Sequence, residues 1–313
     1  MQESAHTAEL GFGLAAVGRP AYITSDREHD LGSPAARSVA AMETRVHALL
    51  DTAWALGIRY LDAARSYGRA EEFLGSWLSA HPDRRASLTI GSKWGYEYVG
   101  DWNPAAELHE RKEHSLAMLD RQWRQTLAAL GGPPDFYLIH SVTPDSPALA
   151  DGALLERIGE IRETGVRVGI STSGPLQAEV IDRATSEHGD LFSVVQSTWN
   201  VFEPSAGPAL ARAHDAGWTV VLKEVLANGW LSDAHAPTVV RDEARAASLT
   251  VDEYAFAVAR RQEWADIVLS GAATDDQLRR GAERSASGDA LPMPSFAVDP
   301  QSYWKRRSSL DWA

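Results

Sequence analysis

The feature of this sequence that most constrains its fold is a regular alternation of short apolar runs and amphipathic helical segments. Runs rich in β-branched and aromatic residues predict eight strands, at Leu10–Leu14, Arg59–Asp62, Leu88–Lys93, Asp135–His140, Val166–Ser171, Ser193–Gln196, Thr219–Lys223 and Asp266–Gly271. Segments with helical periodicity, such as Arg45–Leu56 and Leu154–Arg162, lie between them. The repeating unit is therefore a strand followed by a helix.

Eight such units in succession predict an α/β fold with a parallel sheet, and eight strands are the number that closes into a (β/α)8 TIM barrel. An open, doubly wound sheet is the alternative, because periodicity alone does not separate the two arrangements. Gly57, Gly165 and Gly217 follow three of the helices, where a left-handed residue turns the chain back. We expect a single domain, with the barrel at about residues 10–286 and a C-terminal tail at about 287–313 that packs across it.

Charge and cysteine content exclude several classes of function. The 313 residues include 43 acidic and 30 basic side chains, for a formal net charge of -13, so the chain has no broad basic face for nucleic acid or an anionic membrane. The absence of cysteine removes disulfides, thiolate metal sites and cysteine nucleophiles. The N-terminal residues lack the pattern of a signal peptide. We therefore expect a cytoplasmic protein whose partner is a small molecule.

Four polar residues stand at or just after the ends of successive predicted strands: Asp62, Tyr67, Lys93 and His140. Each alone has a structural explanation, such as a cap or a solvated tip, but together they would meet at the catalytic face of a barrel. An ammonium group favours a neighbouring phenolate, so Lys93 would lower the pKa of Tyr67 toward the working range. Asp62 would keep a buried Lys93 charged, and His140 could orient a carbonyl oxygen. This set predicts the protonation of a carbonyl oxygen.

At these positions the sequence resembles the aldo-keto reductase superfamily. The matching stretches are Leu61–Gly68 (LDAARSYG), Ser92-Lys93, Asp135–His140, Gly169-Ile170-Ser171, Val195-Gln196, and Gly271-Ala272 with Gln277-Leu278. The resemblance runs from about Leu10 to Ser285 and implies a barrel with NADP(H) or NAD(H) across its C-terminal mouth. It also implies hydride transfer between nicotinamide and the carbonyl carbon of an aldehyde or ketone. By resemblance Asp62, Tyr67, Lys93 and His140 are the catalytic residues, and Tyr67 exchanges the proton.

The same resemblance implies a set of cofactor contacts: Ser171, Thr172 and Gln196 for the nicotinamide carboxamide, and Lys223, Gly271, Thr274, Gln277 and Arg280 elsewhere along the cofactor. Thr172 replaces the family's Asn. Lys223 replaces an aromatic residue that stacks on the nicotinamide, and it could lie over the ring, reach the pyrophosphate or pair with a neighbouring acid.

The residues expected near the 2′-phosphate depart from the family's pattern. Asp275 and Asp276 stand where cations often occur, and Arg279 and Arg280 are the only cations close by in sequence. Cationic hydrogen bonds are what separate a 2′-phosphate from a ribose hydroxyl. We expect NADP(H) to be favoured by a narrow margin, with NAD(H) as the alternative.

Aromatic residues in two loops suggest a substrate pocket. Trp94 and Trp102 follow the third predicted strand and Trp199 follows the sixth, so all three would overhang the barrel mouth and favour apolar carbonyl compounds. No metal is expected, because His109 and His114 are five positions apart and a zinc-binding helix places its histidines four apart. The alternative function is a regulatory barrel that binds the cofactor with little turnover.

Overall fold

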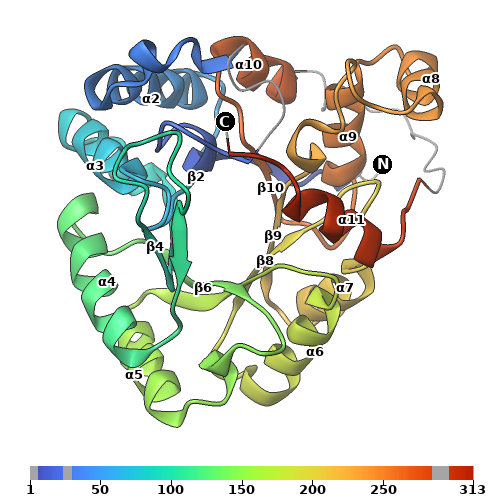
Figure 1. Cartoon of the computed structure of the whole chain (residues 1–313). Helices are drawn as coiled ribbons and strands as arrows, with labels where there is room; N and C mark the ends of the chain where they lie inside the picture. Colours follow the sequence, from blue (N-terminus) through green and yellow to red (C-terminus); the bar gives the residue numbers. More distant parts are fainter. Residues whose placement is uncertain (1–5, 24–29, 284–295, 313) are drawn as a thin grey trace.

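Eight parallel strands form a closed barrel, in the order β1-β10-β9-β8-β7-β6-β3-β2 (Figure 1). The structure is a computed structural model that describes residues 6–23, 30–283 and 296–312. The strands are β1 (Glu9–Gly13), β2 (Tyr60–Asp62), β3 (Thr89–Trp94), β6 (Phe136–Val142), β7 (Arg167–Thr172), β8 (Val194–Thr198), β9 (Thr219–Lys223) and β10 (Ile267–Ser270). Every predicted strand is present with small differences in its bounds. The closed barrel is confirmed, and the open sheet is excluded.

Helices surround the barrel on its outer face (Figure 1). They are α2 (Val39–Ala55), α3 (Ala70–Ala80), α4 (Leu116–Leu130), α5 (Gly152–Glu163), α6 (Gln177–His188), α7 (Gly207–Asp215), α8 (Thr238–Ala246), α9 (Val251–Arg260) and α10 (Asp275–Glu283). Short 3-10 turns occur at η1 (Leu14–Ala16), η2 (Pro34–Arg37), η3 (Arg85–Ser87), η4 (Pro147–Leu149) and η5 (Ala227–Gly229). In the part of the chain that is described, no helix has the length and apolar character needed to cross a membrane.

Local signals explain where several of these elements begin and end. Helix α2 starts before the periodic segment at Arg45, because the Ser38 side chain caps it by accepting a hydrogen bond from the Ala41 N–H. Gly57, Gly165 and Gly217 have φ of +80°, +95° and +85°, so the predicted left-handed turns are confirmed.

The apolar core has two layers. Inside the barrel, Tyr60, Phe136, Leu138, Val194, Val221, Ile267 and Leu269 form one buried cluster. A larger cluster fills the space between the strands and the surrounding helices. The barrel interior is therefore packed with side chains, which leaves the mouth as the place for a site.

Two segments project over the mouth of the barrel. After β3 the chain forms a hairpin, β4 (Tyr96–Tyr98) with β5 (Glu110–Lys112). Helix α11 (Pro300–Ser308) lies beside the mouth, and the chain then runs across it to the C-terminus (Figure 1). The end of the predicted barrel and the start of the predicted tail, residues 284–295, lie outside the described residues.

A close contact between β7 and β8 makes Gly169 a sensitive position. A Cβ atom at Gly169 would lie 1.9 Å from the Val194 carbonyl oxygen, so Gly169→Ala would force the two strands apart. We expect this substitution to lower the free energy of unfolding by about 1–3 kcal/mol or more. Urea unfolding followed by circular dichroism measures it. Gly159→Ala in α5 is the matched control, because the nearest atom is 3.9 Å away and alanine favours a helix; an equal loss in both variants would contradict the argument.

Candidate active site

A buried ion pair lies at the adjoining ends of β2 and β3. The Lys93 Nζ donates hydrogen bonds to Asp62 Oδ1 at 2.5 Å and to the Ala63 carbonyl oxygen at 2.9 Å. The side chains of Lys93 and Asp62 are only 1% and 3% exposed. The other Asp62 oxygen accepts hydrogen bonds from the Tyr60 hydroxyl at 3.2 Å and from Gln196 Nε2 at 2.8 Å. The pair is thus neutral as a whole and is held in one geometry.

Tyr67 lies beside this pair, in the loop between β2 and α3. The Lys93 Nζ is 4.8 Å from the centroid of the Tyr67 ring, and the Arg19 guanidinium carbon is 5.4 Å from it. Burial raises the pKa of Tyr67 well above its usual value, and the Asp62 carboxylate adds to the increase. The expectation that the pKa of Tyr67 is lowered toward the working range is therefore wrong, because burial and the Asp62 carboxylate outweigh the nearby cations. The phenol keeps its proton at neutral pH.

His140 presents a neutral imidazole to the same space. Its ring lies edge-on to Tyr67, with 5.5 Å between the ring centroids, and its Nδ1 is 3.4 Å from the Ser66 hydroxyl. Burial lowers the pKa of His140 well below its usual value, and the charge of Lys93 lowers it further. A neutral imidazole can donate one hydrogen bond without carrying a charge.

The loop that carries Tyr67 is tied down by a second buried carboxylate. Glu71 of α3 accepts hydrogen bonds from the Ser92 hydroxyl at 2.5 Å, the Thr126 hydroxyl at 2.9 Å and Arg65 Nη1 at 2.5 Å. Arg65 precedes Tyr67 by two residues, so this network fixes the backbone from which the phenol projects.

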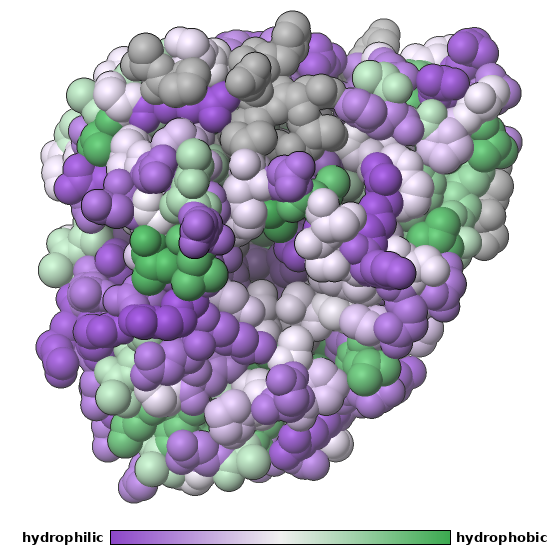
Figure 2. Space-filling model, viewed as in Figure 1, coloured by the Kyte–Doolittle hydropathy of each residue, from purple (hydrophilic) through white to green (hydrophobic). Residues whose placement is uncertain are grey.

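Tyr67 and His140 line a cavity of about 740 Å³ at the mouth of the barrel, where Figure 2 shows a hollow in this face. The volume is within the range of small-molecule and cofactor sites. The predicted residues that line it are Asp62, Tyr67, His140, Gln196, Lys223, Gly271, Gln277 and Arg280. Ser171, Thr172 and Thr274 are not among its lining residues. Lys93 lies directly behind Asp62, so the four expected catalytic residues are brought together.

The buried side-chain oxygen of Gln196 has no hydrogen-bond partner among the described residues. The Nε2 of the same side chain is held by Asp62. A buried carbonyl oxygen without a partner carries a substantial free-energy cost, which an N–H donor in the cavity would relieve. The residue thus fits the carboxamide of a nicotinamide.

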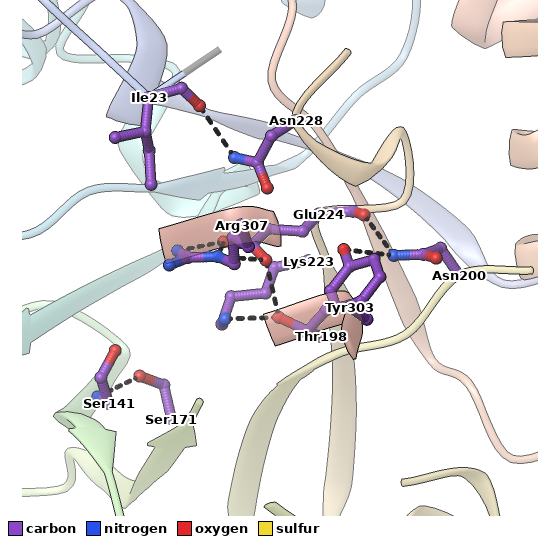
Figure 3. Close-up of polar contacts among 10 residues, drawn as sticks. All are labelled: Ile23, Ser141, Ser171, Thr198, Asn200, Lys223, Glu224, Asn228, Tyr303 and Arg307. Carbon is purple, nitrogen blue, oxygen red and sulfur yellow. Dashed lines mark hydrogen bonds and ion pairs between the residues drawn. The ribbon is translucent and has the colours of Figure 1, made fainter. Parts of the chain in front are cut away.

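The two neighbouring positions are committed to other contacts. Ser171 Oγ accepts a hydrogen bond from the Ser141 N–H at 2.8 Å (Figure 3). The Thr172 hydroxyl lies 2.8 Å from the Ser197 hydroxyl, which donates to Gln177 Oε1. The Thr172 side chain thus belongs to a hydrogen-bond network between β7, β8 and α6 and does not line the cavity.

Lys223 and Glu224, at the end of β9, meet a residue from the far end of the chain (Figure 3). Glu224 accepts hydrogen bonds from Arg307 Nε at 2.9 Å and Arg307 Nη2 at 2.6 Å. The Lys223 Nζ donates to the Thr198 hydroxyl at 2.8 Å, and that hydroxyl donates to Glu224 Oε2 at 3.0 Å. Burial lowers the pKa of Lys223 to about 8. Burial alone would raise the pKa of Glu224, but Arg307 and Lys223 hold it at about 2.

The opposite end of the cavity is acidic. Arg280 is paired with Asp276, and its Nε is 3.6 Å from Asp252. Gln277 Nε2 donates to Asp30 Oδ1 at 2.9 Å. Asp30 and Asp252 both line the cavity with Arg280, so the cation expected to meet a 2′-phosphate is already engaged by carboxylates.

The three expected substrate-binding tryptophans lie elsewhere, which is a correction to the sequence prediction. Trp94 is 1% exposed and follows Lys93 in β3, so strand alternation points it away from the side on which Lys93 lies. Trp102 donates its indole N–H to the Arg37 carbonyl oxygen at 2.8 Å, and Trp199 packs against Trp264. None of the three lines the large cavity.

Other aromatic residues take their place. Tyr22, Tyr96 and Trp312 line the cavity beside Tyr67 and His140. Tyr22 and Trp312 come from segments with no repeating pattern, so the sequence carried no signal for them. Within the described ranges, no group of three or more His, Asp or Glu side chains is arranged to hold a metal ion.

Comparison with known proteins identifies the family. The model of the Aldo/keto reductase family matches residues 10–274, and the chain therefore belongs to that family, which indicates an oxidoreductase. A comparison with curated proteins gave no match.

Solved structures agree in fold. A Pseudomonas aeruginosa protein described as an aldo-keto reductase is 21% identical, with a TM-score of 0.66 and coverage of 90% of each chain. The holo form of an aldo-keto reductase from Bacillus halodurans is 19% identical, with a TM-score of 0.68, and covers 98% of this chain and 94% of its own. At these identities the likeness shows the fold alone.

The buried pair predicts strong coupling between Lys93 and Asp62. Lys93→Met leaves a buried carboxylate without its counter-ion, and we expect it to lower the free energy of unfolding by about 3–5 kcal/mol. The double variant Asp62→Asn/Lys93→Met should lose less than the sum of the single losses, by roughly 0.5–3 kcal/mol. Urea unfolding at neutral pH measures all three variants.

The exposed pair Arg212–Asp182 is the control for this cycle, because its side chains are 58% and 46% exposed. Arg212→Met should cost less than about 1 kcal/mol. Additive losses at Lys93 and Asp62 would show that the two side chains do not act as a pair.

Proposed function

We propose that this protein is a NAD(P)(H)-dependent oxidoreductase that interconverts a small aldehyde or ketone and its alcohol, with Tyr67 as the general acid and base. The observation that carries the proposal is the pairing of a protonated phenol and a neutral imidazole on one wall of a cavity, next to a neutralised Lys93–Asp62 pair. Membership of the family supports it.

The residues present suit a nicotinamide cofactor, which supplies the hydride when bound. Gln196 would accept a hydrogen bond from the carboxamide at its unpartnered Oε1, while its Nε2 stays on Asp62. Gly271, Gln277 and Arg280 would contact the far end of the dinucleotide, and Lys223 would lie near its nicotinamide end. Ser171 would act indirectly, through the backbone of Ser141.

The residues of this chain would supply the proton that the carbonyl oxygen receives. His140 would hold the carbonyl oxygen with an imidazole N–H, and Tyr67 would donate its O–H to that oxygen as the hydride reaches the carbon. One hydride and one proton convert the carbonyl to an alcohol, and the reverse reaction returns the proton to the phenolate. The Lys93 Nζ is 4.8 Å from the centroid of the Tyr67 ring, and its charge would help to stabilise the phenolate.

A regulatory barrel that binds the cofactor with little turnover is the second candidate. Two observations favour it: a lysine, Lys223, lines the cavity at the position where the family's pattern has an aromatic residue, and the Thr172 hydroxyl is turned away from the cavity. An assay of cofactor oxidation with simple aldehydes separates the two functions, because only the reductase consumes the cofactor.

Removal of the Tyr67 hydroxyl tests the proposed acid. Tyr67→Phe should reduce carbonyl reduction by about 10²–10⁴-fold, because a positioned general acid contributes a factor of that size. Binding of the cofactor, measured by fluorescence titration, should persist. Tyr137→Phe is the matched control, because Tyr137 is a buried tyrosine of β6 that does not line the cavity. A Tyr67→Phe enzyme with more than half of the wild-type rate would refute the assignment.

The acidic environment of Arg280 predicts the cofactor preference. We expect NADPH to bind more tightly than NADH by only about tenfold, because a 2′-phosphate must compete with Asp276 and Asp252 for this guanidinium. Arg280→Ala should narrow the gap, and Asp252→Asn should widen it by releasing the guanidinium. Dissociation constants from calorimetry check this. Equal or tighter binding of NADH by the wild type would contradict the preference and leave the catalytic proposal standing.

A further inference from the structure

The charged side chains around the reacting centre do not balance. Among the described residues, the charged side chains at the Tyr67 and His140 end of the cavity, together with Lys93 behind Asp62, are the cations Arg19, Lys93, Lys223 and Arg307 and the carboxylates Asp62, Glu110 and Glu224. Asp30, Asp233, Asp252 and Arg280 also line the cavity, and Arg65 is paired with Glu71. Lys93 is paired with Asp62 at 2.5 Å, Arg19 with Glu110 at 2.7 Å, and Arg307 with Glu224 at 2.6 Å. The remaining charge is that of Lys223.

The contacts of Lys223 explain why no carboxylate directly compensates its charge. Its Nζ reaches Glu224 only through the Thr198 hydroxyl, which accepts from Lys223 and donates to Glu224 (Figure 3). Arg307 occupies both carboxylate oxygens of Glu224 with its fork of N–H groups. A bidentate pair between a guanidinium and a carboxylate is stronger than a contact that passes through a hydroxyl group, so Glu224 mainly compensates the charge of Arg307 and not that of Lys223.

Lys223 also lies within electrostatic reach of the place where hydride transfer must occur. It pairs in register with Thr198 of β8, the strand that carries the unsatisfied Gln196, and both Lys223 and Gln196 line the cavity. The charge of Lys223 contributes to the lowered pKa of His140, the residue proposed to hold the carbonyl oxygen. A nicotinamide bound between Gln196 and Tyr67 would therefore feel this ammonium.

We propose that Lys223 makes the site discriminate between the two redox forms of the nicotinamide cofactor, so that the reduced form binds more tightly than the oxidised form. The inference rests on the proposed function. The oxidised ring carries a positive charge that the reduced ring lacks, and the rest of the dinucleotide is identical. Repulsion between like charges several ångströms apart in a partly buried site corresponds to a factor on the order of tenfold in affinity.

The Lys223 ammonium, which would cause this discrimination, titrates within the pH range in which binding can be measured. The pKa of Lys223 is lowered to about 8, chiefly by burial. The charged groups that act on it come from several elements, namely Glu224 after β9, Arg307 on α11, Lys93 on β3 and Asp62 on β2. Below this pKa the ammonium repels the oxidised ring, and above it the neutral amine does not. The discrimination should thus be large at low pH and fall as the pH rises through about 8.

The test is the ratio of two dissociation constants, that of the oxidised form divided by that of the reduced form of the same dinucleotide. Fluorescence titration with NADPH and calorimetry with NADP⁺ give both values, and NADH with NAD⁺ serves if that pair binds better. In the wild type we expect the ratio to be about tenfold higher near pH 6.5 than near pH 9. This series needs no variant, so it does not depend on the folding of one.

Two substitutions separate charge from shape. Lys223→Met should lower the ratio by about tenfold near pH 6.5 and make it independent of pH, because the stem remains and the charge is gone. Lys223→Arg should keep the ratio high even near pH 9, because a guanidinium stays protonated. A purely structural role would change the affinity for both forms equally and leave the ratio unaltered.

The outcomes also distinguish this inference from the proposed function. If both forms bind and carbonyl compounds are reduced, but the ratio is flat with pH and unchanged in Lys223→Met, the inference about Lys223 is wrong and the proposed function stands. If neither form binds to the wild type, both are wrong.

Discussion

The active site depends on the buried contact between Lys93 and Asp62. Two ions in the interior of a barrel rarely add stability, since their loss of hydration offsets their attraction, so the function of the pair has to be sought in what it organises. Asp62 holds Gln196 by its amide nitrogen, and among the described residues the buried amide oxygen has no hydrogen-bond partner. Burial raises the pKa of Tyr67, the Asp62 carboxylate adds to the increase, and the phenol therefore keeps the proton that it would donate.

The C-terminal segment determines which charge near this pair remains uncompensated, because Arg307 pairs with Glu224. Helix α11 brings Arg307 to Glu224, and five residues later the ring centroid of Trp312 lies 4.6 Å from the Arg19 guanidinium carbon. Arg19 in turn donates to the Ser66 carbonyl oxygen, beside Tyr67. The C-terminal segment thus contacts Glu224, beside Lys223, and also Arg19, which holds the backbone beside Tyr67. The Arg307 guanidinium pairs with Glu224, the carboxylate that would otherwise neutralise Lys223. The charge of the cavity near Lys223 therefore depends on a contact between α11 and the residue that follows β9.

Local patterns explain what could be predicted from the sequence. The strands and the positions of Asp62, Lys93 and His140 follow from periodicity and from the rule that barrel strands end at one face. The prediction that Trp94 lines the mouth is wrong because Trp94 belongs to β3, where a shift of one residue from Lys93 reverses the direction of the side chain. The pKa of Tyr67 and the partners of Glu224 depend on burial and on contacts between residues far apart in the chain, which no local pattern encodes.

Transfer of a labelled hydride tests the central claim most directly. NADPH carrying deuterium at both C4 positions of the nicotinamide is incubated with the wild-type protein and an aldehyde such as 4-nitrobenzaldehyde, and the alcohol is analysed by mass spectrometry and NMR. If this site reduces carbonyl compounds, each alcohol molecule carries one deuterium on the former carbonyl carbon, and its hydroxyl proton comes from solvent. Binding of the labelled cofactor without formation of deuterated alcohol from any aldehyde or ketone offered would contradict the account and favour a regulatory barrel.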